Sequence, residues 1–213
     1  MNFGTKKIHI LLVGGGTGGH FYPLISIGEA LRTSSQNIVL YYAGPDVYDA
    51  DALAAQNIHF VQIPAGKQRR YTSLLNFFDI FKMGFGVLSA IVKMYFIMPD
   101  VIFSKGGFGA FPALIASRVF RIPVIIHESD SVPGRVNAIA GKFAVKIALS
   151  YKEAAQYFPK DKTAYTGNPV RKEIREPLVN GAIEYLNLEH NLPVLLILGG
   201  SQGSLFINQA FAK

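Results

Sequence analysis

An open, doubly wound α/β sheet is the fold class that this sequence predicts. Apolar runs rich in β-branched residues alternate with helix-like patterns along its 213 residues. Several of these runs lack polar alternation, which is typical of strands buried on both faces of a parallel sheet. The glycine-rich stretches GGGTGG, GGFG and GGSQG each follow such a run. Ligands bind to doubly wound sheets outside the carboxyl ends of the strands, so these loops are where a site is expected.

The order of the elements supports a parallel sheet, because strands and helices alternate from the first residues onward. The predicted strands are Ile8–Val13, Ile38–Ala43, His59–Ile63, Val101–Ser104, Pro123–His127, Lys146–Leu149, Ala164–Tyr165 and Val194–Leu198. The predicted helices are Pro23–Arg32, Ala50–Gln56, Leu74–Phe96, Phe111–Phe120, Arg135–Lys142 and Glu153–Tyr157. The lysines before the first run resemble a signal peptide. However, that run is short and leads directly into a glycine turn, which favours a buried strand.

Composition narrows the class of ligand. Half of the residues are hydrophobic and 16% are charged, which is enough apolar material for a buried core. The absence of cysteine excludes disulfides and thiolate metal sites. The net charge of +7 favours anionic partners. Basic residues interleaved with exposed aromatic residues are not found, so phosphorylated substrates and anionic lipids are favoured over nucleic acid.

The chain is expected to contain one full domain and the start of another. Residues 1–168 carry the regular alternation, and residues 169–191 are polar, contain proline and lack a sustained strand pattern. Residues 192–213 then begin the same strand, glycine turn and helix again. A single strand and helix cannot bury their own apolar faces. We therefore expect the coding sequence to continue past Lys213.

The segment Lys67–Asp100 is unusually apolar. A membrane span is disfavoured because charged residues and glycines interrupt it. A core helix accounts for one apolar stripe, formed by Leu74, Phe77, Phe78, Phe81, Phe85 and Leu88. Basic residues beside an apolar face are also typical of an interfacial membrane anchor. That second interpretation assigns membrane contact to Lys67, Arg69, Arg70, Phe77, Phe78, Phe81 and Lys82.

The first glycine turn, GGGTGGH, contains the spacing G-x-G-x-x-G, which is a weak signal by itself. No acidic residue stands at the tip of the next strand for a ribose, and no lysine ends the turn as in a P-loop. The following helix start favours an anion, with Pro23 predicted in its first turn. His20 beside those N–H groups is expected to be neutral and able to act as a general base. The alternative is that His20 only caps the helix or packs.

A second polar cluster is HESD, residues 127–130, at the carboxyl end of a predicted strand. No second histidine follows at helical spacing, so no metal site is predicted. In the alternative interpretation, Asp130 or Ser131 merely caps the next helix.

The motifs GGGTGGHFYPLISIGEALR, SKGGFGAFPALIAS, PVIIHESDSVPGRVN, TGNPVR and LLILGGSQGSLFIN occur here in this order. Together they resemble the MurG family of bacterial N-acetylglucosaminyltransferases, which convert lipid I to lipid II in peptidoglycan synthesis. The resemblance covers essentially the whole chain. It implies that this fragment alone is inactive, because the uracil and sugar sites of the donor are missing from it. It implies a GT-B fold of two Rossmann-like domains, an inverting transfer without metal or other cofactor, and a peripheral position on the cytoplasmic face of the plasma membrane. It also implies UDP-N-acetylglucosamine, lipid I and anionic membrane lipids as partners, together with proteins of cell-wall synthesis and division.

The resemblance also assigns roles to residues. It implies that His20 is the base and that Glu128 is an orienting or acid-base carboxylate. The substrate-binding residues that it implies are Thr17, Gly18, Gly19, Asp130, Arg171 and Ser201. Two positions depart from the family pattern: Asp130 stands where asparagine is common, and Phe108 stands where tyrosine is common. Two rival classes stay open, another GT-B enzyme acting on a nucleotide sugar and a non-catalytic acceptor-side membrane subunit.

Overall fold

The computed structural model describes residues 6–35, 37–66, 75–176, 178, 180–189, 192–199 and 204–211, with the backbone alone at residues 75–78. The chain divides into two compact units, Met1–Pro169 and Val170–Lys213, and each is described by itself. The predicted assignment of 169–191 to a linker and 192–213 to a second domain stays a prediction.

The first unit is a parallel sheet of seven strands in the order β3-β2-β1-β4-β5-β6-β7. The strands are β1 (Ile8–Val13), β2 (Ile38–Gly44), β3 (Ile58–Gln62), β4 (Val101–Ser104), β5 (Val124–Glu128), β6 (Lys146–Leu149) and β7 (Thr163–Tyr165). Each pair of neighbouring strands is parallel, which confirms the predicted doubly wound α/β sheet. Strands β1 to β3 are added toward one edge of the sheet and β4 to β7 toward the other, so the strand order reverses between β1 and β4.

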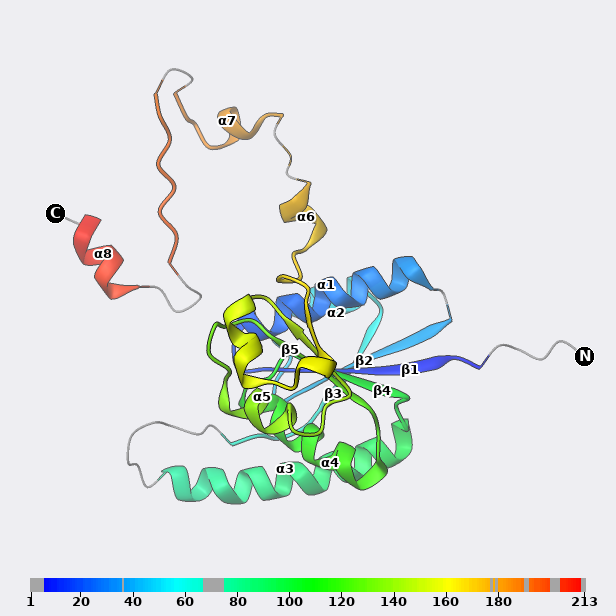
Figure 1. Cartoon of the computed structure of the whole chain (residues 1–213). Coiled ribbons are helices and arrows are strands. Elements are labelled where there is room, and N and C mark those ends of the chain that lie inside the picture. Colours follow the sequence, from blue (N-terminus) through cyan, green and yellow to red (C-terminus); the bar gives the residue numbers. More distant parts are fainter. Residues whose placement is uncertain are drawn as a thin grey trace, which may run out of the picture. The chain divides into compact units, whose positions relative to one another are not determined.

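Helices cover both faces of this sheet (Figure 1). They are α1 (Gly18–Ser34), α2 (Ala50–Ala55), α3 (Leu75–Ile97), α4 (Phe111–Phe120) and α5 (Arg135–Ala140), with short 3-10 helices η1 (Phe108–Ala110), η2 (Lys152–Tyr157) and η3 (Lys160–Lys162). One core joins the sheet to α1 and α2 through Phe21, Leu24 and Leu53. The other joins the sheet to α3, α4 and α5. The helix predicted at Glu153–Tyr157 is the 3-10 helix η2.

Helix α1 begins at Gly18 and not at the predicted Pro23. The carbonyl of Thr17 already accepts hydrogen bonds from the N–H groups of His20 (3.1 Å) and Phe21 (3.2 Å), which closes the first turn. Pro23 lies inside the helix, so its prediction in the first turn is wrong. The end of the glycine turn is therefore the N-terminus of the helix.

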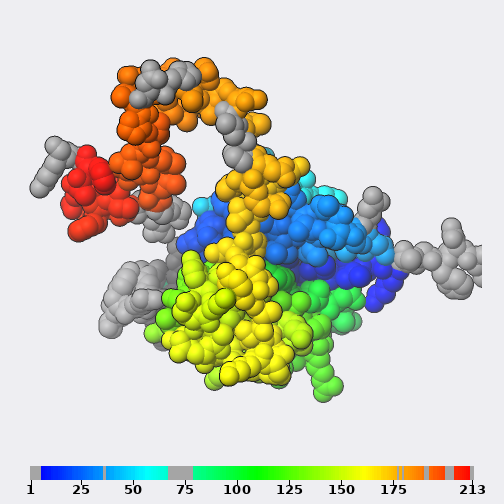
Figure 2. Space-filling view, turned by 45° about the horizontal axis from the view of Figure 1, so that its top comes forward, coloured from blue at the N-terminus to red at the C-terminus, as the bar shows by residue number. Residues whose placement is uncertain are grey.

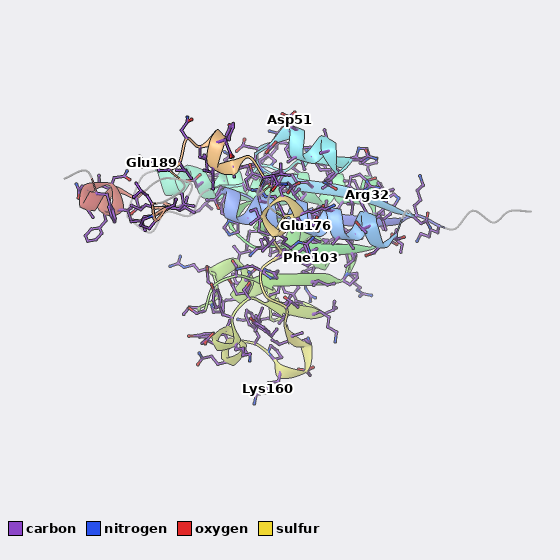
Figure 3. All side chains as sticks on the ribbon, turned by 90° about the horizontal axis from the view of Figure 1, so that it is seen from above. Arg32, Asp51, Phe103, Lys160, Glu176 and Glu189 are labelled. Atoms are coloured by element: carbon purple, nitrogen blue, oxygen red, sulfur yellow. The ribbon has the colours of Figure 1, made fainter. Side chains whose placement is uncertain are left out.

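At the other end of α1, the Arg32 guanidinium, labelled in Figure 3, donates hydrogen bonds to main-chain carbonyls on the β2 and β3 side of the sheet.

Helix α3 buries a different face from the predicted one. Phe81, Phe85 and Leu88 are exposed, so their assignment to a core stripe is wrong. The buried face carries small or flexible residues instead, Gly86, Ala90 and Met94, and packs in the core beside α4. A large aromatic face is thus left outside the core.

We expect Gly86→Ala to destabilise the packing of α3. A Cβ atom at this position would meet the backbone carbonyl of Pro64 and would lie 3.2 Å from Pro112 Cγ. Because backbone has to move to accept it, the free energy of unfolding measured in urea should fall by about 1–3 kcal/mol. The matched variant Gly84→Ala meets nothing within 4 Å. It should gain about 0.5–1 kcal/mol from helix propensity, and equal stability of the two variants would contradict the packing.

The second unit contains three helices among its described residues, α6 (Lys172–Arg175), α7 (Ala182–Tyr185) and α8 (Leu205–Phe211). Helix α8 follows the third glycine stretch, as predicted. The strand predicted at Val194–Leu198 is not formed, and most of its apolar side chains are exposed. A strand needs a neighbour to complete its hydrogen bonds. The described part of this unit offers no such neighbour.

Candidate active site

Three loops at the carboxyl edge of the sheet form the candidate site, those after β1, β4 and β5. The loops after β1 and β4 lie at the point where the order of the strands reverses, which is where doubly wound sheets bind ligands, and the loop after β5 lies beside them. The start of α1 follows β1, and the second polar cluster lies at the end of β5 and in the loop after it. In the space-filling view, α1 (blue) borders the surface formed by the chain after β5 (green to yellow) (Figure 2).

The first two glycine turns touch each other through their backbones. Gly107, in the turn after β4, has φ +78°, and a Cβ atom there would lie 2.7 Å from the carbonyl oxygen of Gly15. The same Cβ atom would lie 3.2 Å from His20 Nε2. Gly16, with φ +99°, lies under the ring of Phe108, which a Cβ atom would strike. Glycine is therefore required because both turns adopt positive φ and leave no room for side chains.

His20 lies in the first turn of α1, half-buried. Its Nδ1 forms a 2.9 Å hydrogen bond with the hydroxyl oxygen of Thr17, the N-cap residue. Burial lowers the pKa of His20 below 6.5, and the nearby Lys105 ammonium lowers it further, while Asp130 and Glu128 raise it. The net direction is downward, so the imidazole is neutral at pH 7. His20 does not cap α1, because the N-cap is Thr17 and the His20 ring bonds a side-chain hydroxyl and no backbone N–H among the described residues, so the capping alternative is wrong. The role of His20 as a base stays a prediction.

Glu128 ends β5 and is 3% exposed. Its carboxylate accepts hydrogen bonds from the N–H groups of Asp130 (2.9 Å) and Gly134 (3.1 Å) and from Asn137 Nδ2 (3.0 Å). These bonds fix the loop between β5 and α5. The geometry thus gives Glu128 an orienting function in its own loop, and the acid-base role stays a prediction.

Asp130 is exposed in the same loop. The N-cap residue of α5 is Gly134, so neither Asp130 nor Ser131 caps that helix. The capping alternative for this cluster is therefore wrong. Asp130 is close enough to His20 to affect the pKa of His20, so the polar cluster HESD lies near the first glycine turn.

Two buried polar residues were missed by the sequence interpretation. Lys105, after β4, is 2% exposed, and its Nζ has no hydrogen-bond partner among the described residues. Asn137, in α5, holds both Glu128 and the main-chain carbonyl of His127 through its Nδ2. The signal that could have identified Lys105 is a lysine inside a glycine turn after a buried strand. Asn137 gave no such signal, because a polar residue in a short helix is ordinarily exposed.

His127 connects the site to the segment TGN. Its Nε2 lies 2.9 Å from the carbonyl oxygen of Gly167, and burial lowers its pKa below 6.5. The Ser150 hydroxyl donates to Asn168 Oδ1 at 2.7 Å beside it. These contacts hold the end of the first unit against the carboxyl edges of β5 and β6.

Of the remaining predicted substrate contacts, three lie in the candidate site and the other two are not placed there. Thr17, Gly18 and Gly19 form the cap and first turn of α1 with His20. Arg171 is the N-cap residue of α6 and belongs to the second unit. Ser201 lies outside the described residues. In the described ranges, no group of three or more His, Asp or Glu side chains is arranged to hold a metal ion.

The exposed face of α3 consists of Ile80, Phe81, Phe85, Leu88, Val92, Tyr95 and Phe96. Lys82 is exposed on the same helix, whereas Lys67, Arg69 and Arg70 lie outside the described residues and only the backbone of Phe77 and Phe78 is described. By length and composition alone, the stretch Asp79–Ile97 would be long and apolar enough to cross a bilayer, and 17% of it is buried. This surface lies on α3 and is separate from the first turn of α1.

Comparison with known proteins agrees with this geometry. Residues 10–149, which include most of β1, all of β2 to β6 and all three loops, match the glycosyltransferase family 28 N-terminal domain. The chain belongs to glycosyltransferase family 28. The predicted GT-B resemblance is therefore confirmed for the Rossmann-like sheet of its N-terminal domain.

Two curated relatives of this chain share the name UDP-N-acetylglucosamine–N-acetylmuramyl-(pentapeptide) pyrophosphoryl-undecaprenol N-acetylglucosamine transferase. The Borrelia turicatae enzyme is 40% identical over 95% of this chain and 56% of its own length. The Treponema pallidum (strain Nichols) enzyme is 37% identical over 93% of this chain and 53% of its own length. The chain thus spans about half the length of the curated relatives it matches.

Solved structures give the same result. Acinetobacter baumannii MurG is 25% identical, with a TM-score of 0.59 over 80% of this chain and 48% of that chain. UDP-N-acetylglucosamine 2-epimerase from Rickettsia bellii has a TM-score of 0.57 over 87% of this chain and 52% of that chain, at 13% identity. The epimerase supports the fold alone.

Proposed function

We propose that the full-length protein transfers N-acetylglucosamine from UDP-N-acetylglucosamine to the 4-hydroxyl group of the muramyl sugar of lipid I, giving lipid II. The observation that carries this proposal is a neutral His20 at the start of α1, in a chain 40% identical to a transferase named for that reaction. This chain supplies the sheet, the three loops and the base. The remaining length of the relatives is expected to supply most of the donor contacts.

The reaction needs one proton to be removed and one anion to be stabilised. The 4-hydroxyl oxygen attacks the anomeric carbon of the donor sugar, and the bond from that carbon to UDP breaks. With Nδ1–H donating to the Thr17 hydroxyl, His20 Nε2 carries a free lone pair and takes the hydroxyl proton. This tautomer is the one that the base role requires.

The leaving diphosphate requires positive charge or N–H donors. The first N–H groups of α1, from Gly18 and Gly19, have no acceptor within the helix and favour an anion. Arg171 and Ser201 are proposed as further donor contacts. Stabilisation of the developing charge by such fixed groups is a large contribution to catalysis in sites of this kind.

The direct test is a transfer assay. Full-length protein is incubated with radiolabelled UDP-N-acetylglucosamine and a short-chain lipid I analogue. The expected product is a labelled disaccharide lipid that forms only when both substrates are present. Release of UDP that does not depend on the acceptor, or conversion of the donor to its 2-epimer, would instead favour the rival nucleotide-sugar enzymes.

Membrane contact is proposed for the exposed face of α3, on the cytoplasmic side of the plasma membrane. Seven large apolar side chains there are at least half exposed, and Phe96 is 80% exposed. The opposite face of α3 packs against the rest of the first unit, because Ala90 and Met94 lie in the core. A helix held in this way is suited to lie against the membrane surface, with exposed basic residues such as Lys82 close to anionic lipid.

We expect Phe85→Ser to reduce the fraction of protein that floats with vesicles of anionic phospholipid. Phe85 is 64% exposed, so its replacement removes apolar contact with lipid without removing core packing. The loss should be about tenfold in partitioning, as roughly 1.5 kcal/mol of burial implies. The control Tyr157→Ser, at an exposed site outside α3, should float like the wild type. Unchanged flotation of Phe85→Ser would contradict the proposed surface.

A further inference from the structure

Lys105 is the least expected residue in the site. It is 2% exposed, its Nζ has no hydrogen-bond partner, and it takes part in none of the ion pairs among the described residues. Isolated buried ammonium groups are costly, because desolvation is not offset by a partner. A buried cation of this kind in a native fold therefore calls for a functional reason.

The nearby carboxylate does not neutralise Lys105 directly. Glu128 is buried in the same region, yet its oxygens accept the hydrogen bonds from Asp130, Gly134 and Asn137. Its interaction with Lys105 is electrostatic only, and it opposes the effect of burial on the Lys105 pKa. The charge of Lys105 is therefore left to act on its surroundings.

The first glycine turn lies between Lys105 and His20. The Lys105 N–H donates to the Val13 carbonyl at 2.9 Å, which places the residue beside the end of β1. A Cβ atom on Gly14 would lie 3.6 Å from Lys105 Cβ and 3.2 Å from the His20 carbonyl oxygen. Two residues after Lys105, a Cβ atom on Gly107 would lie 3.2 Å from His20 Nε2. Lys105 and His20 thus flank the same turn.

We propose that Lys105 is a positioning residue of the transfer reaction, whose buried ammonium keeps the His20 imidazole uncharged until a substrate hydroxyl gives up its proton. This inference rests on the proposed function for its catalytic meaning. Its physical content is that two positive charges that flank one turn in a poorly solvated site disfavour each other. Because Lys105 is fixed in the interior of the fold, the effect is present before any substrate arrives.

The charges that face His20 come from three elements of the first unit. Lys105, after β4, is the cation, while Glu128 at the end of β5 and Asp130 in the next loop are the anions. The two carboxylates raise the pKa of His20, whereas burial and Lys105 lower it. Without Lys105, only burial would oppose the effect of the two carboxylates on the pKa of His20. His20 would then hold a proton to higher pH and would be a base in a smaller fraction of molecules.

Lys105 itself carries a measurable cost for stability. Burial lowers its pKa from 10.5 to about 8, so the ammonium is largely charged at pH 7. Between about pH 8 and pH 10.5 the unfolded chain binds this proton more tightly than the folded chain does. The contribution of Lys105 to folding is therefore unfavourable below pH 8 and improves as pH rises through that window. Replacing the side chain with an apolar one of similar length should raise Tm at pH 7.

The variant Lys105→Met provides the test, in the full-length protein with histidine side chains labelled with 13C. The His20 resonance is identified by its absence from the spectrum of His20→Gln. We expect the His20 titration in Lys105→Met to move to higher pH than in the wild type, with Tm raised. The acidic limb of log kcat/KM should move with it, so that at pH 6 the variant falls about three- to tenfold further below its plateau.

Two controls separate this role from packing. Lys105→Arg keeps the charge and should keep the titration of His20 near that of the wild type. Lys142→Met removes an exposed lysine and should leave it unchanged. An unchanged His20 titration in Lys105→Met would overturn the inference, whatever its activity. Absence of transfer by the wild type would overturn the proposed function alone, because the titration is measured without substrate.

Discussion

Replacing His20 with alanine in the full-length enzyme is expected to lower kcat by about 10²–10⁴-fold, the usual contribution of a general base. The loss should appear in kcat more than in KM, because Nε2 acts on the proton in the transition state. Circular dichroism and Tm should stay close to those of the wild type, since the ring is half-buried and bonded only to Thr17 Oγ1 among the described residues.

The pH profile adds a second readout for the same residue. Because burial lowers the pKa of His20 from its ordinary value, wild-type kcat/KM should be flat at neutral pH and should fall only at acidic pH, as the imidazole gains a proton. The His20→Ala variant should lack that acidic limb. The control His59→Ala, an exposed histidine on β3, should retain both activity and limb. Near-normal turnover of His20→Ala would reassign the base, and Glu128 would be the next residue to test.

Gly107→Ala is expected to lower both the free energy of unfolding and kcat, and its effect should be the second largest. The new methyl group would lie 2.7 Å from the Gly15 carbonyl and 3.2 Å from His20 Nε2, and alanine is also strained at φ +78°. Strain and overpacking each cost about 1–3 kcal/mol, and displacement of the base by about 1 Å can cost about 10²-fold in rate. Urea unfolding and kcat measured on the same preparation would report both effects.

Gly167→Ala separates strain from collision in that experiment. Gly167 has a similar φ of +73°, but nothing lies within 4 Å of the position that an alanine Cβ atom would occupy there. It should therefore lose about 1–2 kcal/mol from backbone strain alone. If Gly107→Ala were no more destabilised than Gly167→Ala, the close contact between the two glycine turns would be wrong.

The sheet could be predicted from the sequence because its signal is local. Strands such as Ile8–Val13, Val101–Ser104 and Lys146–Leu149 begin and end at the predicted residues. Continuous apolar runs and glycine punctuation are properties of neighbouring residues. The prediction of a strand at Val194–Leu198 was wrong because a strand also needs a partner strand, which the local pattern does not reveal.

The direction of side chains on α3 could not be predicted in the same way. An apolar helix offers several stripes, and the sequence favoured the aromatic one with Phe81 and Phe85. The structure buries Gly86 and Ala90 instead, because close approach of Pro64 and α4 needs small residues there. Which stripe is buried depends on the shape of the neighbouring surface, and this is absent from the local pattern.

The candidate site was predictable in its parts and less so in its connections. Glycine turns and a polar cluster after strands identified His20, Glu128 and Asp130, and the structure brings these close enough to influence each other. Lys105 was missed because a lysine is ordinarily exposed, and only three-dimensional burial marks it as unusual. Arg171 and Ser201 stay predictions, one in the separate second unit and the other outside the described residues.

The three loops of the site differ in how much sequence change they can accept. The turns after β1 and β4 meet backbone to backbone at Gly15 and Gly107, so neither can gain a side chain at that contact. The loop after β5 is instead tied down by one carboxylate, Glu128, and several of its residues are exposed between these bonds. Sequence change therefore has its room at residues 131–133, which lie between the two bonds to Glu128, whereas Asp130 faces His20 and has to be kept.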